Sequence, residues 1–340
     1  MGKNTIHAEA YRFQASFYDF QTAAISIAGE ISLAWFRLKS ANIQLQVLNE
    51  QVETNEKVLA LIRARFASGQ VRGVDILRQQ QLIENTNEQK TVLEAQMGLL
   101  NNQLATLLGQ PPGIIFPSSP ELPPLPPMPE TGIPLELVNR RPDVLSAYYR
   151  LQASDREVAV AVSNKYPRLN FSLTAALRSN TLIGLFDSQA LSLSSSLLAP
   201  IFYGGRLNAD LNRTEAIRQQ LLNDYGQTVL EAFREVEDAL IQEKTQLERI
   251  DFIEKQLSLS EKAFDQLRIE YLNGSIAYLD VLVTLNQQQQ LRLDLVDAQR
   301  DLIEFRVALY RALAGGFETQ KEIQVEEDFL DQPDIPVLNN

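Results

Sequence analysis

Two stretches of the chain repeat one another, and this duplication constrains the fold more than any other feature of the sequence. Residues 271–282 read YLNGSIAYLDVL, and residues 66–77, which lie 205 positions earlier, read FASGQVRGVDIL. In both stretches a helical pattern reaches an aromatic residue, breaks at a Gly and restarts before an Asp. Self-similarity at a constant long offset is typical of repeat architectures. The sequence therefore predicts two equivalent halves, each with a helical hairpin whose tip lies at the Gly. The same offset pairs Asp19 with Asp224, Glu30 with Glu235, Ala34 with Ala239, Arg63 with Arg268, and Leu104 with Leu309.

Long helices with a seven-residue apolar repeat form the body of each half. Residues 6–67 contain no Pro, and a second helix is expected from about residue 206 to 271. A strict seven-residue repeat makes helices coil left-handedly around their neighbours. At ~1.5 Å per residue the second helix would be roughly 100 Å long, too long for a compact domain. The sequence thus predicts a projecting coiled coil or part of a tube. The repeating residues are Leu45, Val52, Leu59 and Phe66, matched by Ile250, Leu257, Phe264 and Tyr271.

The two halves are joined by a proline-rich segment. Of the 15 prolines, ten fall between Pro111 and Pro134, which excludes a helix and favours extended polyproline geometry. Such a segment fits either a stiff connector or a ligand for SH3-type domains, and we interpret residues 110–140 as a connector. The acidic tail, residues 317–340, is expected to be irregular surface chain.

An alternating pattern interrupts the second half. After a helix over about residues 141–165, apolar residues alternate with small polar ones over residues 169–178 and again over 191–201. Each run has about the ten residues that a tilted strand needs to cross a bilayer. The pattern fits an amphipathic hairpin packed on a helical core or a transmembrane hairpin with a watery lumen, and the Ser, Thr and Asn face favours the second. Because no strand edge can stay open in lipid, a transmembrane hairpin requires several copies of the chain.

Composition excludes several functional classes. The chain has no Cys and a single His, which excludes a disulfide framework and leaves too few ligands for most metal sites. Its net charge of −12 argues against a nucleic-acid surface. There is no glycine-rich phosphate loop and no nucleophile elbow. We therefore expect no enzyme activity, no catalytic residues, and no cofactor or metal.

Four motifs carry a resemblance to a known family. They are RRPDV at residues 140–144, the segment 161–169, PIFYGGR at residues 200–206, and LYRALAGG at residues 309–316. On these motifs the chain resembles the TolC-like outer-membrane factors, or outer-membrane efflux proteins, over residues 2–316. The resemblance is strongest to the lipoprotein branch that serves resistance-nodulation-division pumps. It implies a mostly α fold in which duplicated long helical hairpins form a trimeric α-helical barrel and a β-hairpin contributes to a transmembrane β-barrel.

The resemblance also implies an organisation along the chain. We expect a first repeat over residues 1–109, a connector over 110–140, a second repeat over 141–316, and a tail over 317–340. Within the second repeat the β-hairpin is expected at about 168–203 and the helical hairpin at about 206–314. The counterpart of the helix and β-hairpin would precede Met1, so we expect an N-terminally truncated member of the family.

The family's function implies partners and a location. Such proteins are the outer-membrane exit ducts of tripartite efflux systems, and they passively conduct drugs or other small molecules from an inner-membrane pump through the periplasm to the exterior. The expected partners are two further copies in a homotrimer, a periplasmic adaptor (membrane fusion protein), the inner-membrane exporter and outer-membrane lipid, with no nucleic acid. The expected location is the outer membrane of a Gram-negative-type bacterium, reaching into the periplasm. The alternative is a periplasmic coiled-coil adaptor or scaffold without channel activity.

The resemblance places a gate at the helical tips. It implies that Asp75 and Tyr271 are partners across the two hairpins, and that Leu279 and Asp280 lie near the constriction. Three copies of Asp280 would form an acidic ring that favours cations. Asp75 and Asp280 also fit the simpler role of residues that stabilise a helix start.

Four further tip residues are expected to contact the gate or the adaptor, and two positions depart from the family pattern. The four are Arg65, Arg72, Gly69 and Gly274. The departures are Ile276, where a basic residue is frequent, and Val283, where an Asp is frequent. Arg72 is a candidate for the missing cation.

Overall fold

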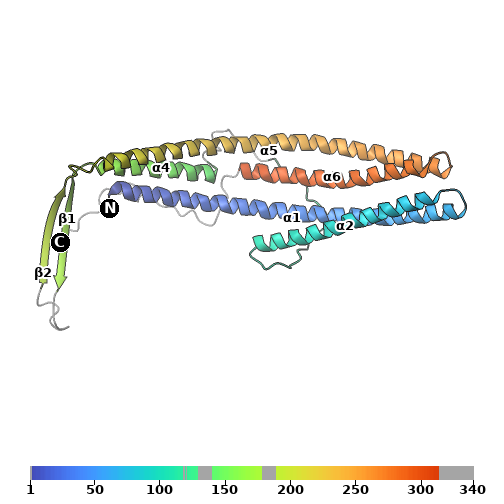
Figure 1. The fold of residues 1–340 in the computed structure, drawn as a ribbon, viewed down its shortest axis with the longest axis horizontal. Helices are drawn as coiled ribbons and strands as arrows, with labels where there is room; N and C mark the ends of the chain where they lie inside the picture. The colour runs from blue at the N-terminus through green and yellow to red at the C-terminus, as the bar shows by residue number, and fades with distance from the viewer. Residues whose placement is uncertain (1, 118, 120, 129–139, 178–188, 314–340) are drawn as a thin grey trace. The chain divides into compact units, whose positions relative to one another are not determined.

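The fold is mostly α, as expected from the sequence (Figure 1). The computed structural model describes residues 2–117, 119, 121–128, 140–177 and 189–313. The elements are α1 (Lys3–Ala67), α2 (Gly73–Leu107), α4 (Pro142–Ser163), β1 (Arg168–Leu177), β2 (Gln189–Leu198), α5 (Arg206–Leu272) and α6 (Tyr278–Ala312). α1 and α2 form one helical hairpin, and α5 and α6 form the other. The predicted helix boundaries lie within three residues of those observed. The predicted acidic tail, residues 317–340, lies outside the described residues.

The chain divides into two compact units, which are described separately. The first contains the described residues of 1–21 and 142–230, and the second those of 22–141 and 231–317. The long helices α1 and α5 contribute to both units.

In the second unit, the most buried residues of each long helix form a line, here called the deep line. It lies beside the predicted apolar stripe. On α1 the most buried positions are spaced by seven residues, and the equivalent line recurs on α5 with the same offset of 205. Predicted members such as Leu45 and Val52 are only half-buried, and Phe66 is 48% exposed. The two lines together give the alternating three- and four-residue spacing of a coiled coil. The deep line is Ala34, Ala41, Leu48, Asn55 and Ile62 on α1, and Ala239, Gln246, Ile253 and Ser260 on α5.

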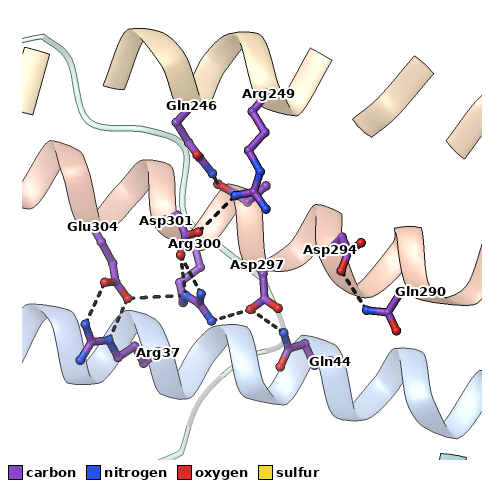
Figure 2. Close-up of polar contacts among 11 residues, drawn as sticks. Arg37, Gln44, Gln246, Arg249, Gln290, Asp294, Asp297, Arg300, Asp301 and Glu304 are labelled. Carbon is purple, nitrogen blue, oxygen red and sulfur yellow. Dashed lines mark hydrogen bonds and ion pairs between the residues drawn. The ribbon is translucent and has the colours of Figure 1, made fainter. Parts of the chain in front are cut away.

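Ionic contacts link the two hairpins within the second unit (Figure 2). Arg37 of α1 makes two hydrogen bonds to Glu304 of α6, at 2.8 and 2.9 Å. The hydrogen bonds to Glu304 raise the pKa of Arg37, so the guanidinium stays protonated. Arg300 lies beside Glu304 and pairs with Asp301 at 2.6 Å. This cluster fixes the register of α6 against α1.

In the first unit, α4 packs against both long helices. Ser146 donates a hydrogen bond of 2.6 Å to Asp19 of α1. Tyr149 stacks on Tyr18 of α1, with ring centroids 5.5 Å apart. On the other side, Arg218 of α5 pairs with Asp155 at 2.5 Å.

The β-hairpin has two chemically distinct faces. β1 and β2 pair antiparallel so that Leu173 lies opposite Leu193 and Ser172 lies opposite Ser194. Leu173 and Leu193 are 67% and 74% exposed. The predicted alternation is therefore confirmed, but the predicted end of the second strand at Ile201 is wrong: β2 ends at Leu198. Pro200 follows closely, and its missing N–H cannot continue a strand ladder.

Candidate functional site

The two helical tips have the same backbone turn. Gly69 and Gly274 have φ angles of 73° and 79°, the left-handed region that glycine adopts without strain. Behind each glycine the chain closes a six-residue loop, with Gln70 N donating to the Arg65 carbonyl at 2.9 Å. The counterpart bond joins Ser275 N to the Glu270 carbonyl at 3.0 Å. This pattern is the Schellman motif, which satisfies the last carbonyls of a helix. The predicted role of both glycines as turn residues is confirmed.

Both hairpins contribute to one apolar cluster beside the tips. Ile62 from α1 is fully buried against Tyr271, Tyr278 and Val281 of the second hairpin. Ile276, one of the two positions that depart from the family pattern, packs against this cluster. The cluster thus joins the two hairpins through apolar contacts, which burial of aromatic surface stabilises. The other departing position, Val283, is exposed.

Asp75 is buried at the start of α2 and is 5% exposed. One of its carboxylate oxygens accepts a hydrogen bond of 3.3 Å from the backbone N–H of Arg72, as a residue that stabilises a helix start does. The other oxygen lies 3.5 Å from Nη1 of Arg78. That oxygen and the hydroxyl of Tyr271 are both buried without a hydrogen-bond partner among the described residues. Asp75 and Tyr271 therefore lie in the same tip region without a direct hydrogen bond between them.

Arg65 of α1 crosses to the second hairpin. Its guanidinium lies 4.7 Å from the ring centroid of Tyr271, within the range of a cation–π interaction. The same group donates to the backbone carbonyls of Tyr271 at 3.3 Å and Leu272 at 3.5 Å. These carbonyls belong to the last turn of α5, where a cation is favourable. Arg65 therefore links the first hairpin to the second.

A chain of buried neutral groups continues from the tip into the bundle. The hydroxyl of Tyr278 donates to Oε1 of Gln79, whose amide donates to the Asn55 carbonyl at 2.8 Å. Asn55 and Gln289 exchange amide hydrogen bonds of 3.0 and 3.4 Å. Gln79 and Asn55 are both fully buried. Because an unpaired buried amide is costly, these bonds fix the hairpins in one register.

Burial raises the pKa of both tip tyrosines. For Tyr271 the loss of solvation is the largest cause, the charge of Asp75 adds to it, and Arg65 opposes it. For Tyr278 the pKa is raised further, again by burial first and then by Tyr271 and Asp75. Both hydroxyls are therefore neutral at physiological pH.

The remaining predicted residues lie on the surface of the tips. Leu279 is 42% exposed, and Asp280 is exposed in the first turn of α6. Arg72 is exposed at the N-cap of α2, and only its backbone N–H reaches Asp75. The structure thus groups Asp75, Tyr271 and Arg65 in the interior and leaves Leu279, Asp280 and Arg72 available to other molecules.

The sequence patterns did not predict the chain of hydrogen bonds through Gln79, Asn55 and Gln289. Asn55 and Gln79 are polar residues at core positions, and a search for apolar repeats passes over them. The signal was present, because Asn55 lies seven residues after Leu48 and seven before Ile62 on the deep line of α1.

Among the described residues, no group of acidic or His side chains is arranged to hold a metal ion. In the same part of the chain, no helix has the length and apolarity needed to cross a membrane.

Comparison with known proteins agrees with this arrangement. The family model described as "Outer membrane efflux protein" matches residues 1–110 and 133–315. The pyoverdine export outer membrane protein OpmQ of Pseudomonas aeruginosa is 28% identical over 317 residues, which are 93% of this chain and 67% of that protein. OpmQ of Pseudomonas putida is 32% identical, covering 89% of this chain and 65% of that protein.

Solved structures show the same fold. A membrane protein from Pseudomonas aeruginosa superimposes with a TM-score of 0.86 at 28% identity, over 92% of this chain and 73% of that one. The chain spans about two thirds of the length of the curated relatives. With the family model covering most of its length, the chain belongs to the outer membrane efflux protein family.

Proposed function

We propose that the chain acts as the outer-membrane exit duct of a tripartite efflux system and conducts small molecules passively to the exterior. The observation that carries this proposal is its membership of the outer membrane efflux protein family over both repeats. Relatives are named for pyoverdine export and for solvent efflux. A passive duct leaves the choice of compound to the pump, so the proposal specifies small molecules without naming one.

A duct requires partners and a closed tube. One chain supplies two helical hairpins, too few to enclose a channel, and the proposal therefore includes a homotrimer. The energy and selectivity would come from an inner-membrane exporter and a periplasmic adaptor. The long heptad-patterned helices support this part of the proposal, because such helices coil around neighbours.

The β-hairpin is proposed to enter the outer membrane. Its apolar face, with Leu173 and Leu193, is exposed in the single chain and would face lipid. The opposite face pairs small polar residues such as Ser172 and Ser194, which suits a watery lumen. Hairpins from neighbouring copies would contribute to the closed barrel that the bilayer requires.

The helical tips are proposed to form the periplasmic gate. Asp75 would stabilise the start of α2 at the gate, and Tyr271 would join the hairpins through its buried ring. Arg65 contributes through its contacts with Tyr271. Leu279 and Asp280 would line the constriction, where three Asp280 carboxylates attract cations. Arg72 is proposed to contact a neighbouring copy or the adaptor, and Gly69 and Gly274 to keep the tip turns tight.

The alternative is a periplasmic adaptor or scaffold without a channel. It accounts for the coiled-coil helices, but it gives no role to a hairpin whose apolar residues Phe171, Leu173 and Leu193 are exposed.

Two measurements test the proposal. Outer membranes containing the protein should yield complexes of three copies by light scattering, and a single-copy particle would exclude the tube. In cells, Asp75→Ala with Asp280→Ala should increase the entry of vancomycin, because the gate loses its acidic ring and the carboxylate that stabilises the start of α2. Asp251→Ala, an exposed carboxylate on α5 away from the tips, is the matched control. Unchanged entry in the double variant would remove the gate from these residues.

A further inference from the structure

The proline-rich connector is fastened to both helical hairpins of the second unit. At its first half, the backbone N–H of Phe116 donates to Oδ1 of Asn101 on α2, at 2.9 Å. At its second half, Nη1 of Arg306 on α6 donates to the carbonyl of Pro126. The hydroxyl of Tyr310, one turn along α6, donates to the carbonyl of Pro127 at 2.8 Å. Nζ of Lys39 on α1 also donates to the carbonyl of Glu121, at 3.1 Å. The connector is therefore bound at particular backbone atoms by three helices.

Two of the residues that bind the connector occupy equivalent positions in the two repeats. Asn101 and Arg306 are separated by the 205-residue offset of the duplication, so each lies at the same place on its return helix. Their chemistry differs in a way that matches the connector. Asn101 uses its oxygen to accept an N–H, whereas Arg306 donates to a Pro carbonyl. Because proline has no N–H, a proline stretch offers only acceptors, and a residue that binds its backbone must be a donor.

The position that pairs with Arg306 in the second repeat holds a different residue in the first repeat. In the first repeat it is Leu38, which is 1% exposed and belongs to the apolar cluster against which Phe116 packs. In the second repeat the equivalent residue is Glu243, also buried. Glu243 binds Nε and Nη2 of Arg306 at 2.8 and 2.5 Å.

This buried ion pair has a specific consequence for Arg306. Removing two charges from water is expensive, and such pairs contribute little net stability compared with apolar residues. Glu243 does, however, occupy one edge of the guanidinium and fix its plane, so that Nη1 alone points to Pro126. A rigid, oriented donor is what a polyproline carbonyl needs, and Arg supplies it better than a flexible ammonium.

We propose that Arg306, oriented by Glu243, and Tyr310 form a binding site on α6 for extended proline backbone, which the chain's own Pro126 and Pro127 occupy. The site binds the connector to the second hairpin, while Asn101, Asn102 and Lys39 bind it to the first. The connector thereby joins the two hairpins noncovalently at a place other than the tips. This site is independent of conduction and of the gate.

The absence of Cys from the chain makes a direct test available. A nitroxide attached at Met128→Cys reports the mobility of the connector beside α6, and one at Ile115→Cys reports it beside α2. Both positions are exposed, at 56% and 83%, so neither label displaces packing. Each is measured in detergent on the full chain by electron paramagnetic resonance.

The variants separate the two attachments. Glu243→Leu with Arg306→Met replaces the ion pair with apolar residues of similar size, a change that such sites tolerate. It should make the label at position 128 several-fold more mobile and leave the label at 115 unchanged. Asn101→Ala with Asn102→Ala, which removes the bonds to the N–H groups of Phe116 and Gly113, should do the reverse. Tyr310→Phe, which removes one hydroxyl and no charge, should mobilise position 128 to a smaller extent.

The matched control is Arg37→Met with Glu304→Leu. It removes another ion pair of α6 that does not contact the connector, and both labels should keep their mobility. An immobile label at 128 in the Glu243/Arg306 variant would overturn the proposal. So would equal mobilisation by the control, because that would reflect general loosening of α6. If the double variant does not fold, as judged by helical content, an immobile label in Tyr310→Phe overturns the proposal by itself.

Discussion

The hydroxyl of Tyr278 is predicted to control how readily the two hairpins separate at the tips. Tyr278 is 2% exposed and Gln79 is fully buried, and the bond between them joins α6 to α2. Tyr278→Phe keeps the ring and its packing but leaves Oε1 of Gln79 buried without a donor. An acceptor left unsatisfied in this way costs about 1–3 kcal/mol. Since separation of the tips releases this penalty, local opening should become about 5- to 150-fold more frequent.

Tyr271 provides the matched control. It is 6% exposed and stacks beside Tyr278 with ring centroids 5.5 Å apart, but its hydroxyl has no hydrogen-bond partner among the described residues. Tyr271→Phe removes a buried hydroxyl that makes no bond, so the free energy of tip opening should be unchanged or raised.

Native-state hydrogen exchange measured by mass spectrometry reads both effects directly, because exchange of tip amides reports the local opening free energy. Peptides covering residues 58–80 and 264–285 should exchange faster in Tyr278→Phe only, and peptides from 206–225 should be unaffected in both variants. Equal acceleration by the two substitutions would show that ring environment, and not the bond to Gln79, sets the opening. Acceleration by Tyr271→Phe alone would instead indicate a direct link from Tyr271 to Asp75.

Three further predictions concern pH, the tip turns and the β-hairpin. Because burial raises the folded-state pKa of Tyr278 and Tyr271 above the value of about 10 in an unfolded chain, their contribution to stability is complete below about pH 10 and is lost as pH rises above it. Thermal unfolding followed from pH 8 to 11.5 should show this decline, with a smaller slope in Tyr278→Phe; equal slopes would contradict it. Gly274→Ala forces a side chain into a φ of 79° and should destabilise the chain by about 1–2 kcal/mol, whereas Gly98→Ala, in the interior of α2 with no neighbouring atom within 4 Å of the added carbon, should stabilise it by about 0.5–1 kcal/mol. Melting temperatures that shift in the same direction would refute the comparison. Leu173→Arg should reduce the amount of protein in the outer membrane because a cation on the lipid face costs about 2–4 kcal/mol at the midplane, while Ser194→Arg on the opposite face should be tolerated; equal loss of the two variants from membrane fractions would argue against the assignment of the faces.

The sequence predicted the parts of the fold that depend on local pattern. The long helices follow from uninterrupted seven-residue repeats, and their ends follow from glycines with positive φ, such as Gly69 and Gly274. The strands follow from strict alternation. Where a single residue decides a boundary the prediction was less accurate, as at Pro200, which stops β2 before Ile201.

The interior of the site was harder to predict, because its contacts join residues far apart in the chain. Asn55 and Gln289 are 234 residues apart, and no local pattern indicates that two amides will bind one another. Arg65 was expected to contact the gate or the adaptor, and no local pattern indicates that its guanidinium lies over the ring of Tyr271, 206 residues away. Asp75 was assigned to a gate or to a helix start, and its bond to the Arg72 N–H establishes the second role without excluding the first.

The proposed duct is tested most directly by electrical recording from the purified protein in planar lipid bilayers. The protein should give discrete conductance steps that favour cations, since Asp280 is exposed at the tip and would form an acidic ring. Asp280→Ala should enlarge the steps and weaken the cation preference. A helical, trimeric preparation that inserts into the bilayer and gives no steps, with or without the substitution, would contradict conduction and favour a scaffold.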